Sequence, residues 1–518
     1  MRRRRVFRAV LLLSLAIIYH RAVTQEQQCR LMITLVDGQT RQSVPGVIRC
    51  FPRGGDHSIP LTNLLSRGQG LNDKNAIQDW YVISSPTEVL LPRQPLQLEA
   101  FSGLETELTR VSVDLTAQSQ KNLTIPLRSF SQLSRLNWYS ANTHLHLSNL
   151  NKDQAERYLR EIPRADDLDV LFISYLERAI ADKDYITNRY PIGDLKEFWS
   201  TGVLVNNGEE HRHNFGEQGE GFGHVMLLNI KKTIQPVSIG PGISHRGTDG
   251  TPLQAGIEGA HLQGGTAIWC HNNWGREDVP NFVSGKLDAQ NIFDGGSHGS
   301  YEDSFYHYLN AGISVPFSTG TDWFMYDLAR VYTKVQGSLG IKSWLDALVA
   351  GRSFISNGPL LHLNIEGEDL GGTVDLPYGR DVTVKGEASA RLSFEKLQLI
   401  QNGKVIFESE PKPKEGYFTA SLDRNIKIDG SSWLALRVSA QASNEFGRPL
   451  FAHTSPIYVR VGGKAIRQKD EVAYLIKQME DARREIGSGA LFGSPKERED
   501  VLSVYEKGIR TLQNAGDP

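Results

Sequence analysis

The stretch Asn142-Thr143-His144-Leu145-His146-Leu147-Ser148 places two histidines two residues apart. If this stretch is an extended strand, both imidazoles point to the same face, because side chains alternate along a strand. Two neutral imidazoles that converge on one point are suitable ligands for a borderline metal such as zinc. A His-x-His pair alone is a weak signal, because many such pairs are simply packed or exposed. The neighbouring sequence strengthens it, since ten of the fourteen histidines lie between His144 and His307.

Further candidate ligands stand beside apolar runs or glycine turns. The segments are Gly208-Glu209-Glu210-His211-Arg212-His213-Asn214, Gly223-His224, Cys270-His271 and Gly320-Thr321-Asp322. In α/β barrels the functional residues lie at the C-terminal ends of strands, and His271 and Asp322 each follow a predicted strand. Taken singly, the segments have simpler explanations, namely a solvated loop, a capping histidine or an Asx turn. Taken together with the His-x-His pair, they indicate a metal site.

The composition bounds the class of protein. The chain has 518 residues, which is enough for several domains, and its hydrophobic fraction of 39% is ordinary for a soluble protein. The net charge of −2 does not point to a nucleic-acid partner or to a basic membrane-binding patch.

The first residues predict export. Four arginines at positions 2–5 precede the apolar stretch 9–18, so residues 1–24 are typical of a signal peptide, with an uncleaved anchor as the alternative. We therefore expect an exported protein, located in the periplasm, in the cell envelope or outside the cell. Beyond the signal, we expect no stable membrane span. Cys29 and Cys50 flank a predicted hairpin and could pair in such a compartment.

The pattern of elements predicts a multi-domain chain of α/β and all-β parts. Short strands between turn residues predict a β-sandwich at 25–130 and a second one at 359–465. Between them, strands alternate with helical segments over 131–358, which favours an α/β barrel or an open parallel sheet. Residues 466–518 have helical periodicity and predict a hairpin that packs on the body or on a second subunit, so a homo-oligomer is one alternative.

The order of these motifs resembles the PHP (polymerase and histidinol phosphatase) superfamily, and more closely its CehA/McbA-type, carbaryl hydrolase-like metallohydrolases. The segment Gly351-Arg352-Ser353-Phe354-Ile355-Ser356-Asn357-Gly358-Pro359 is similar to a signature of that branch. The resemblance implies a distorted (β/α)7 barrel with one or two divalent ions of zinc, manganese or iron. It implies one metal held by His144, His146 and Asp322, a second held by His224 and His271, and Glu210, rather than Glu209, as the bridge.

The chain departs from the fuller PHP pattern at two places. Ser174-Tyr175 stands where trinuclear members have Asp-His, and Asp322-Trp323-Phe324 stands where they have Asp-x-His. Both changes remove ligands of a third metal. This disfavours hydrolysis of phosphomonoesters, and it leaves hydrolysis of an ester, carbamate or amide workable.

We therefore expect an exported hydrolase that uses a metal-bound hydroxide on an ester, carbamate or related carbonyl bond of a small molecule. His213, His211 and Tyr175 are candidates for the general acid and Arg212 for binding an anionic group, although for each of the four a supporting or packing role is favoured. His245 could line the pocket or be exposed. The alternatives are a PHP-type phosphoesterase and a non-catalytic glycan- or surface-binding protein with a structural metal site.

Overall fold

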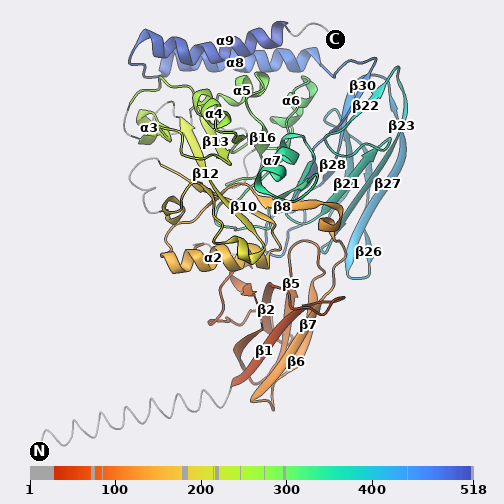
Figure 1. The fold of residues 1–518 in the computed structure, drawn as a ribbon. Helices are drawn as coiled ribbons and strands as arrows, with labels where there is room; N and C mark the ends of the chain where they lie inside the picture. Colours follow the sequence, from red (N-terminus) through yellow and green to blue (C-terminus); the bar gives the residue numbers. More distant parts are fainter. Residues whose placement is uncertain are drawn as a thin grey trace, which may run out of the picture.

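The computed structural model describes residues 28–71, 76–84, 86–177, 185–213, 215, 221–244, 247–272, 275–295, 299–439 and 441–514. The chain is mixed α/β and rich in strands, with N-terminal sheets below a mixed central body, C-terminal strands beside it and two long helices across the top (Figure 1). The predicted signal peptide at 1–24 and His245 lie outside the described residues. No helix in the described part of the chain is long and apolar enough to cross a membrane.

The N-terminal part is a β-sandwich, as predicted. One sheet contains β1 (Gln28–Asp37), β4 (Thr87–Pro92) and β7 (Gln120–Leu127), and the other contains β2 (Gly46–Pro52), β3 (Tyr81–Ile83), β5 (Pro95–Phe101) and β6 (Thr109–Asp114). Alternate residues of β1 are buried, because one face of each sheet packs against the other sheet. Cys29 and Cys50 belong to different sheets and are both free, buried thiols.

The central sheet combines parallel and antiparallel pairs. The strands β8 (Trp138–Asn142), β10 (Val170–Tyr175) and β12 (Leu204–His213) are parallel, as are β15 (Thr266–Trp269), β16 (Ala289–Asn291) and β17 (Phe317–Ser318). Between the two groups, β13 (Gly223–Leu228) is antiparallel to both β12 and β15. The first residues of β13 therefore lie beside the last residues of β12. The short strands β9 (Leu145–His146) and β18 (Asp322–Trp323) form a separate parallel pair.

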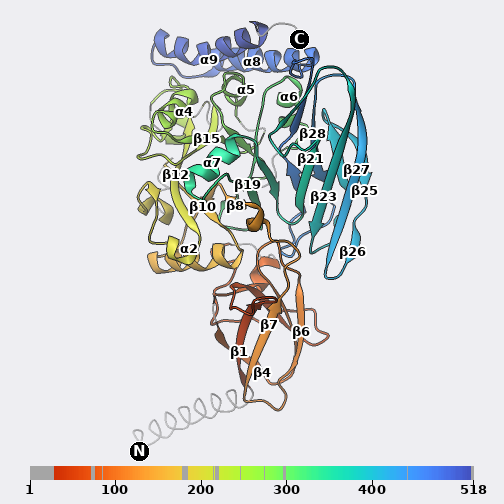
Figure 2. The same ribbon diagram turned by 45° about the vertical axis from the view of Figure 1, so that its right-hand side comes forward.

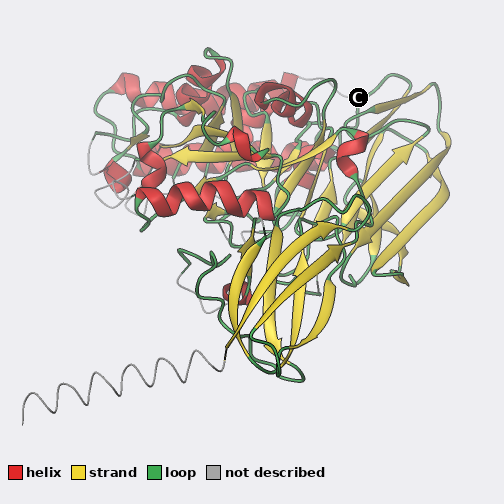
Figure 3. Cartoon of the chain, turned by 60° about the horizontal axis from the view of Figure 1, so that its bottom comes forward, coloured by secondary structure: helices red, strands yellow, loops and turns green. Residues whose placement is uncertain are grey.

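Helices and short strands surround this sheet (Figure 3). The helices are α2 (Lys152–Ala165), α3 (Pro241–Ser244), α4 (Leu253–His261), α5 (Asp278–Val283), α6 (Phe305–Asn310) and α7 (Ile341–Val349), and the short strands are β11 (Gly193–Asp194) and β14 (Ser238–Ile239). The helix α2 begins with a capping box between Asn151 and Gln154. It buries Ala155, Leu159 and Ile162, whose spacing of three and four residues places them on one face.

The C-terminal strands form the second predicted sandwich, but one of its sheets continues the central sheet (Figure 2). From β8, pairing passes through β19 (Arg330–Lys334) and β20 (Ser353–Ser356) to β29 (Ala452–Thr454) and β28 (Ser432–Val438). The same sheet contains β22 (Thr373–Leu376), β24 (Leu397–Gln401), β25 (Lys404–Ser409) and β30 (Ile457–Val461). The facing sheet contains β21 (Leu360–Ile365), β23 (Arg380–Ala390), β26 (Lys412–Lys414) and β27 (Tyr417–Ile428).

The last two helices, α8 (Lys469–Gly489) and α9 (Pro495–Asn514), form the predicted hairpin. Leu475, Met479, Ala482 and Ile486 share one buried face of α8 and belong to the same apolar cluster as residues of α5 and α6. Of the two predicted positions for the hairpin, the structure therefore shows packing on the body of the protein itself.

A buried arginine connects the N-terminal sandwich to the central body. Arg67 is fully buried, and its guanidinium pairs with Asp166 at 2.5 Å. The same guanidinium also donates to the carbonyl oxygens of Met325 and Asp327, which follow β18. The 65–71 segment therefore supports the loop that begins at Asp322.

Candidate metal centre

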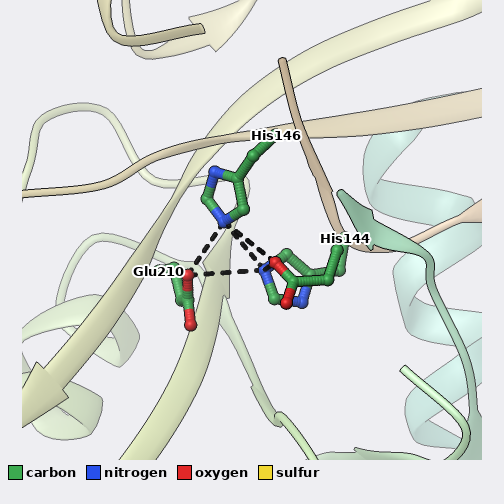
Figure 4. A group of neighbouring side chains, drawn as sticks. His144, His146 and Glu210 are labelled. Carbon is green, nitrogen blue, oxygen red and sulfur yellow. Dashed lines mark hydrogen bonds and ion pairs between the residues drawn. The ribbon is translucent and has the colours of Figure 1, made fainter. Parts of the chain in front are cut away.

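The structure brings together all six side chains predicted as metal ligands. They come from six places in the chain: the β8–β9 junction (His144), β9 (His146), β12 (Glu210), the start of β13 (His224), the residues after β15 (His271) and β18 (Asp322). All six are buried. Figure 4 shows the rings of His144 and His146 and the Glu210 carboxylate pointing toward one another. His224 is the second residue of β13, and the antiparallel direction of this strand places it beside the end of β12.

Four of these side chains form a first half-site. The Nε2 atoms of His144 and His146 are 3.0 Å apart, and His146 Nε2 lies 2.8 Å from Glu210 Oε2. Asp322 Oδ1 lies 3.4 Å from His144 Nε2. The four ligand atoms all lie within 4.8 Å of one another. Two imidazoles and two carboxylates with this convergence suit a four-coordinate divalent ion.

A second half-site uses the other oxygen of the same glutamate. Glu210 Oε1 lies 3.3 Å from His224 Nδ1 and 3.8 Å from His271 Nε2. These three side chains also bring their ligand atoms within 4.8 Å of one another. Glu210 therefore offers one oxygen to each half-site, which is the arrangement expected of a bridging carboxylate.

Several donor atoms of the cluster are buried without a partner, as expected of a cation site. Both ring nitrogens of His224 and Oδ1 of Asp322 are buried without a hydrogen-bond partner. Buried polar atoms without partners are costly. A divalent ion in the first half-site would satisfy Asp322 Oδ1, and one in the second would satisfy one ring nitrogen of His224, because the two nitrogens of an imidazole point in different directions. Space is also kept for the cluster, because a Cβ on Gly295 would lie 2.6 Å from Asp322 Oδ2. The buried nitrogen and carboxylate donors fit zinc, manganese or iron.

Two of the candidate ligands have strained backbones. His271 and Asp322 have φ angles of 48° and 60°, in the left-handed region that favours glycine. Non-glycine residues in this region cost about 1–3 kcal/mol, and they occur often at functional sites, where the surrounding structure imposes them.

The pKa values of three ligands reflect the charges within the cluster. Burial would lower the pKa of His144, but the carboxylate of Asp294 and its neighbours outweigh burial and raise it well above its usual value. Burial would raise the pKa of Glu210, but Arg212 and the adjacent imidazoles hold it well below its usual range. Burial and the charge of Arg212 lower the pKa of His224 to about 3. The ionised Glu210 and the neutral His224 are in the forms that bind metals, whereas a metal at His144 would have to displace the proton of that imidazole.

Asp294 is a residue of the centre that the sequence patterns did not indicate. Its Oδ2 lies 2.7 Å from His144 Nδ1, and Asn291 donates to the same oxygen at 3.0 Å. The corresponding partner of His146 Nδ1 is the Ser174 carbonyl oxygen, at 3.2 Å. These contacts leave the Nε2 atom of each imidazole directed at the cluster. The signal for Asp294 was its place shortly after β16, a strand that was not predicted.

Asp294→Asn should weaken metal binding about 10–100-fold without abolishing it, because the amide still holds the His144 ring but carries no charge. Competition with a chelator of known affinity measures this change. Asp288→Asn is the matched control, since Asp288 holds His261 at 2.9 Å outside the cluster. Equal metal affinities of the two variants would contradict the role assigned to Asp294.

The structure corrects all three candidates for the general acid, and two of them are histidines of β12. Glu209, His211 and His213 share one face of β12, and Glu210 lies on the other, because side chains alternate along a strand. His211 Nδ1 is bonded to Glu209 Oε1 at 2.6 Å, and His213 Nδ1 to the Thr251 carbonyl oxygen at 2.8 Å. Both histidines therefore face away from the metal ligands, and neither is placed to act as the general acid.

Tyr175 also points away from the metal ligands, because its side chain lies on the other face of the sheet. It is paired with Glu209 in the parallel ladder of β10 and β12, so its side chain lies on the face opposite Glu210. Its hydroxyl donates to Glu177 at 3.1 Å. Burial and Glu177 raise the pKa of Tyr175. Arg212, by contrast, lies in the cluster, with Nη2 2.5 Å from Glu210 Oε1.

Aromatic side chains form a wall beside the cluster. The ring centroid of Trp323 is 5.1 Å from that of His146, and Tyr185 is 5.2 Å from Trp323. The side chains of His271, His224 and Asp322 are 9%, 7% and 7% exposed, whereas those of His144, His146 and Glu210 are fully buried. The small exposed area of the cluster is therefore shared by His224 and His271 of the second half-site and Asp322 of the first.

Comparison with known proteins adds no name to this site. No family model matches the chain, and no curated protein matches it significantly. The resemblance to the PHP superfamily therefore stays a prediction from the motifs.

Proposed function

We propose that this chain is an exported metal-dependent hydrolase that cleaves an ester, carbamate or related carbonyl bond in a small molecule. The proposal includes a distorted (β/α)7 barrel of the PHP type as the framework of the site. The observation that carries it is the convergence of six buried nitrogen and carboxylate donors in two half-sites that share Glu210.

The chemistry follows from the ligands. A bound divalent metal lowers the pKa of a coordinated water from 15.7 to about 7 and polarises the carbonyl group of the substrate. Asp294 and the Ser174 carbonyl hold the two imidazoles in the orientation that this requires. Burial of His144, His146 and Glu210 keeps bulk water away from their charges, which strengthens electrostatic stabilisation of a developing oxyanion.

The surroundings favour an uncharged substrate over a phosphate ester. Trp323 and Tyr185 offer an apolar surface next to His146. Arg212 is a cation in contact with the cluster, but its guanidinium is already paired with Glu210. By the resemblance, Ser174, Tyr175 and Phe324 stand where a third metal would need carboxylate or imidazole ligands, and Ser174 Oγ contacts Met226 Sδ instead. Clamping of a phosphate by three metals is therefore not supported by these residues.

The test compares the purified protein with His144→Ala and with the matched control His261→Ala. We expect wild type and control to contain metal by plasma emission and to hydrolyse para-nitrophenyl acetate and naphthyl acetate, and His144→Ala to lose both properties. Turnover of para-nitrophenyl phosphate in place of the esters would favour a phosphoesterase. Metal without any hydrolysis would favour a structural site in a binding protein, and either result would contradict the proposal.

A further inference from the structure

The two half-sites of the metal centre differ in their contact with a permanent positive charge. The first half-site receives Glu210 Oε2, which lies 2.8 Å from His146 Nε2. The second receives Glu210 Oε1, and this oxygen already lies 2.5 Å from Arg212 Nη2. The carboxylate is thus shared between a metal-ligand cluster on one side and a guanidinium on the other.

The position of Arg212 is fixed by the strand. Arg212 is two residues beyond Glu210 in β12, so the two side chains leave the same face of the sheet. Across the antiparallel ladder, the residue directly opposite Arg212 is His224, a ligand of the second half-site. The guanidinium is therefore adjacent to two of the three donors of that half-site.

The charge of Arg212 acts at nearly full strength. Arg212 is 4% exposed and Glu210 is fully buried, so solvent and salt screen their neighbourhood weakly. A guanidinium does not lose its proton in proteins, so the charge is permanent. A divalent ion in the second half-site would have to approach this charge and share Oε1 with it. The first half-site has a full set of four protein ligands and no such competitor among the described residues.

We propose that Arg212 sets the metal stoichiometry of this centre. One divalent ion binds tightly in the first half-site, formed by His144, His146, Asp322 and Glu210 Oε2, and the guanidinium takes the place of a second ion beside Glu210 Oε1. The inference rests on the metal centre of the proposed function. It explains why a chain with ligands for two ions also places an arginine against the carboxylate that would bridge them.

Two substitutions separate the charge of Arg212 from its bulk. Arg212→Met keeps a long side chain and removes the charge, and Arg212→Lys keeps the charge. Each protein is loaded with excess Mn²⁺, desalted and analysed by plasma emission, and electron paramagnetic resonance reports spin coupling between neighbouring ions. We expect about one ion per chain in wild type and in Arg212→Lys, and about two coupled ions in Arg212→Met, a twofold increase.

A second variant keeps the inference testable if Arg212→Met does not fold. His224→Ala removes a donor of the second half-site only, so it should leave the wild-type content at about one ion per chain. The inference is overturned by two ions in wild type, by a loss of metal in His224→Ala, or by one ion in a folded Arg212→Met. The last result would leave the proposed function standing, whereas a wild-type protein that binds no Mn²⁺ or Zn²⁺ would overturn both.

Discussion

Glu210→Gln is expected to remove the bound metal and to lower ester hydrolysis by roughly a thousandfold or more, since a single oxyanion donor is already worth about 10²–10³ in rate. The substitution replaces an ionised carboxylate, which contacts both half-sites, with a neutral amide. It also leaves the buried Arg212 without its anion. Metal content and initial rates on para-nitrophenyl acetate measure the effect, and circular dichroism verifies that the variant is folded.

The chain supplies a matched control in the adjacent residue. Burial raises the pKa of Glu209 to about 8, so at neutral pH this carboxyl is mostly protonated and glutamine is a close substitute. An amide can still accept from the Ile234 N–H and donate to His211. Glu209→Gln should therefore keep metal and activity near wild-type values. If Glu209→Gln lost as much metal and activity as Glu210→Gln, metal binding would not depend on which face of β12 carries the carboxylate. This result would contradict the assignment of Glu210 as the ligand.

Arg67→Met is expected to destabilise the protein by about 3–5 kcal/mol, because it leaves a buried charge without its partner. Asp166 is fully buried and receives two hydrogen bonds from Arg67, from Nε at 3.1 Å and from Nη2 at 2.5 Å. The Met325 and Asp327 carbonyls lose a donor as well. Urea unfolding followed by circular dichroism measures the loss.

Two further variants separate the cost of an unpaired charge from the loss of contact area. Arg67→Met combined with Asp166→Leu should recover part of the stability, since no buried charge is then left alone. Arg110→Met removes an ion pair whose arginine is 60% exposed, and it should cost at most about 1 kcal/mol. A loss in Arg67→Met as small as that in Arg110→Met would contradict the account of this junction.

Elements whose pattern is local were predictable from the sequence. The alternation of Leu31, Ile33 and Leu35 marks β1, and the spacing of Leu475, Met479 and Ala482 marks α8. Each pattern reports which face of a single element is buried, and this needs no knowledge of the neighbours. The direction of β13 and the pairing of β20 with β29 depend on distant partners, and no local pattern determined them.

The candidate ligands were predictable because metal chemistry restricts residue types. The residues that act through the ligands or on the substrate were not predictable, for two physical reasons. Asp294 acts through His144, so its spacing to the other ligands carries no information. His213 was selected for its closeness in sequence to Glu210, but in a strand a separation of three residues places two side chains on opposite faces. Recognition of 204–213 as one strand would have excluded His213 as the general acid.

The most direct test of the proposed metal-dependent hydrolysis is the reversible removal of the metal. The wild-type protein is stripped with a chelator, desalted, assayed with para-nitrophenyl acetate, and then assayed again after stepwise addition of Zn²⁺, Mn²⁺ or Fe²⁺. We predict that hydrolysis is lost with the metal and returns as an ion is restored. Undiminished hydrolysis by the metal-free protein would contradict the account.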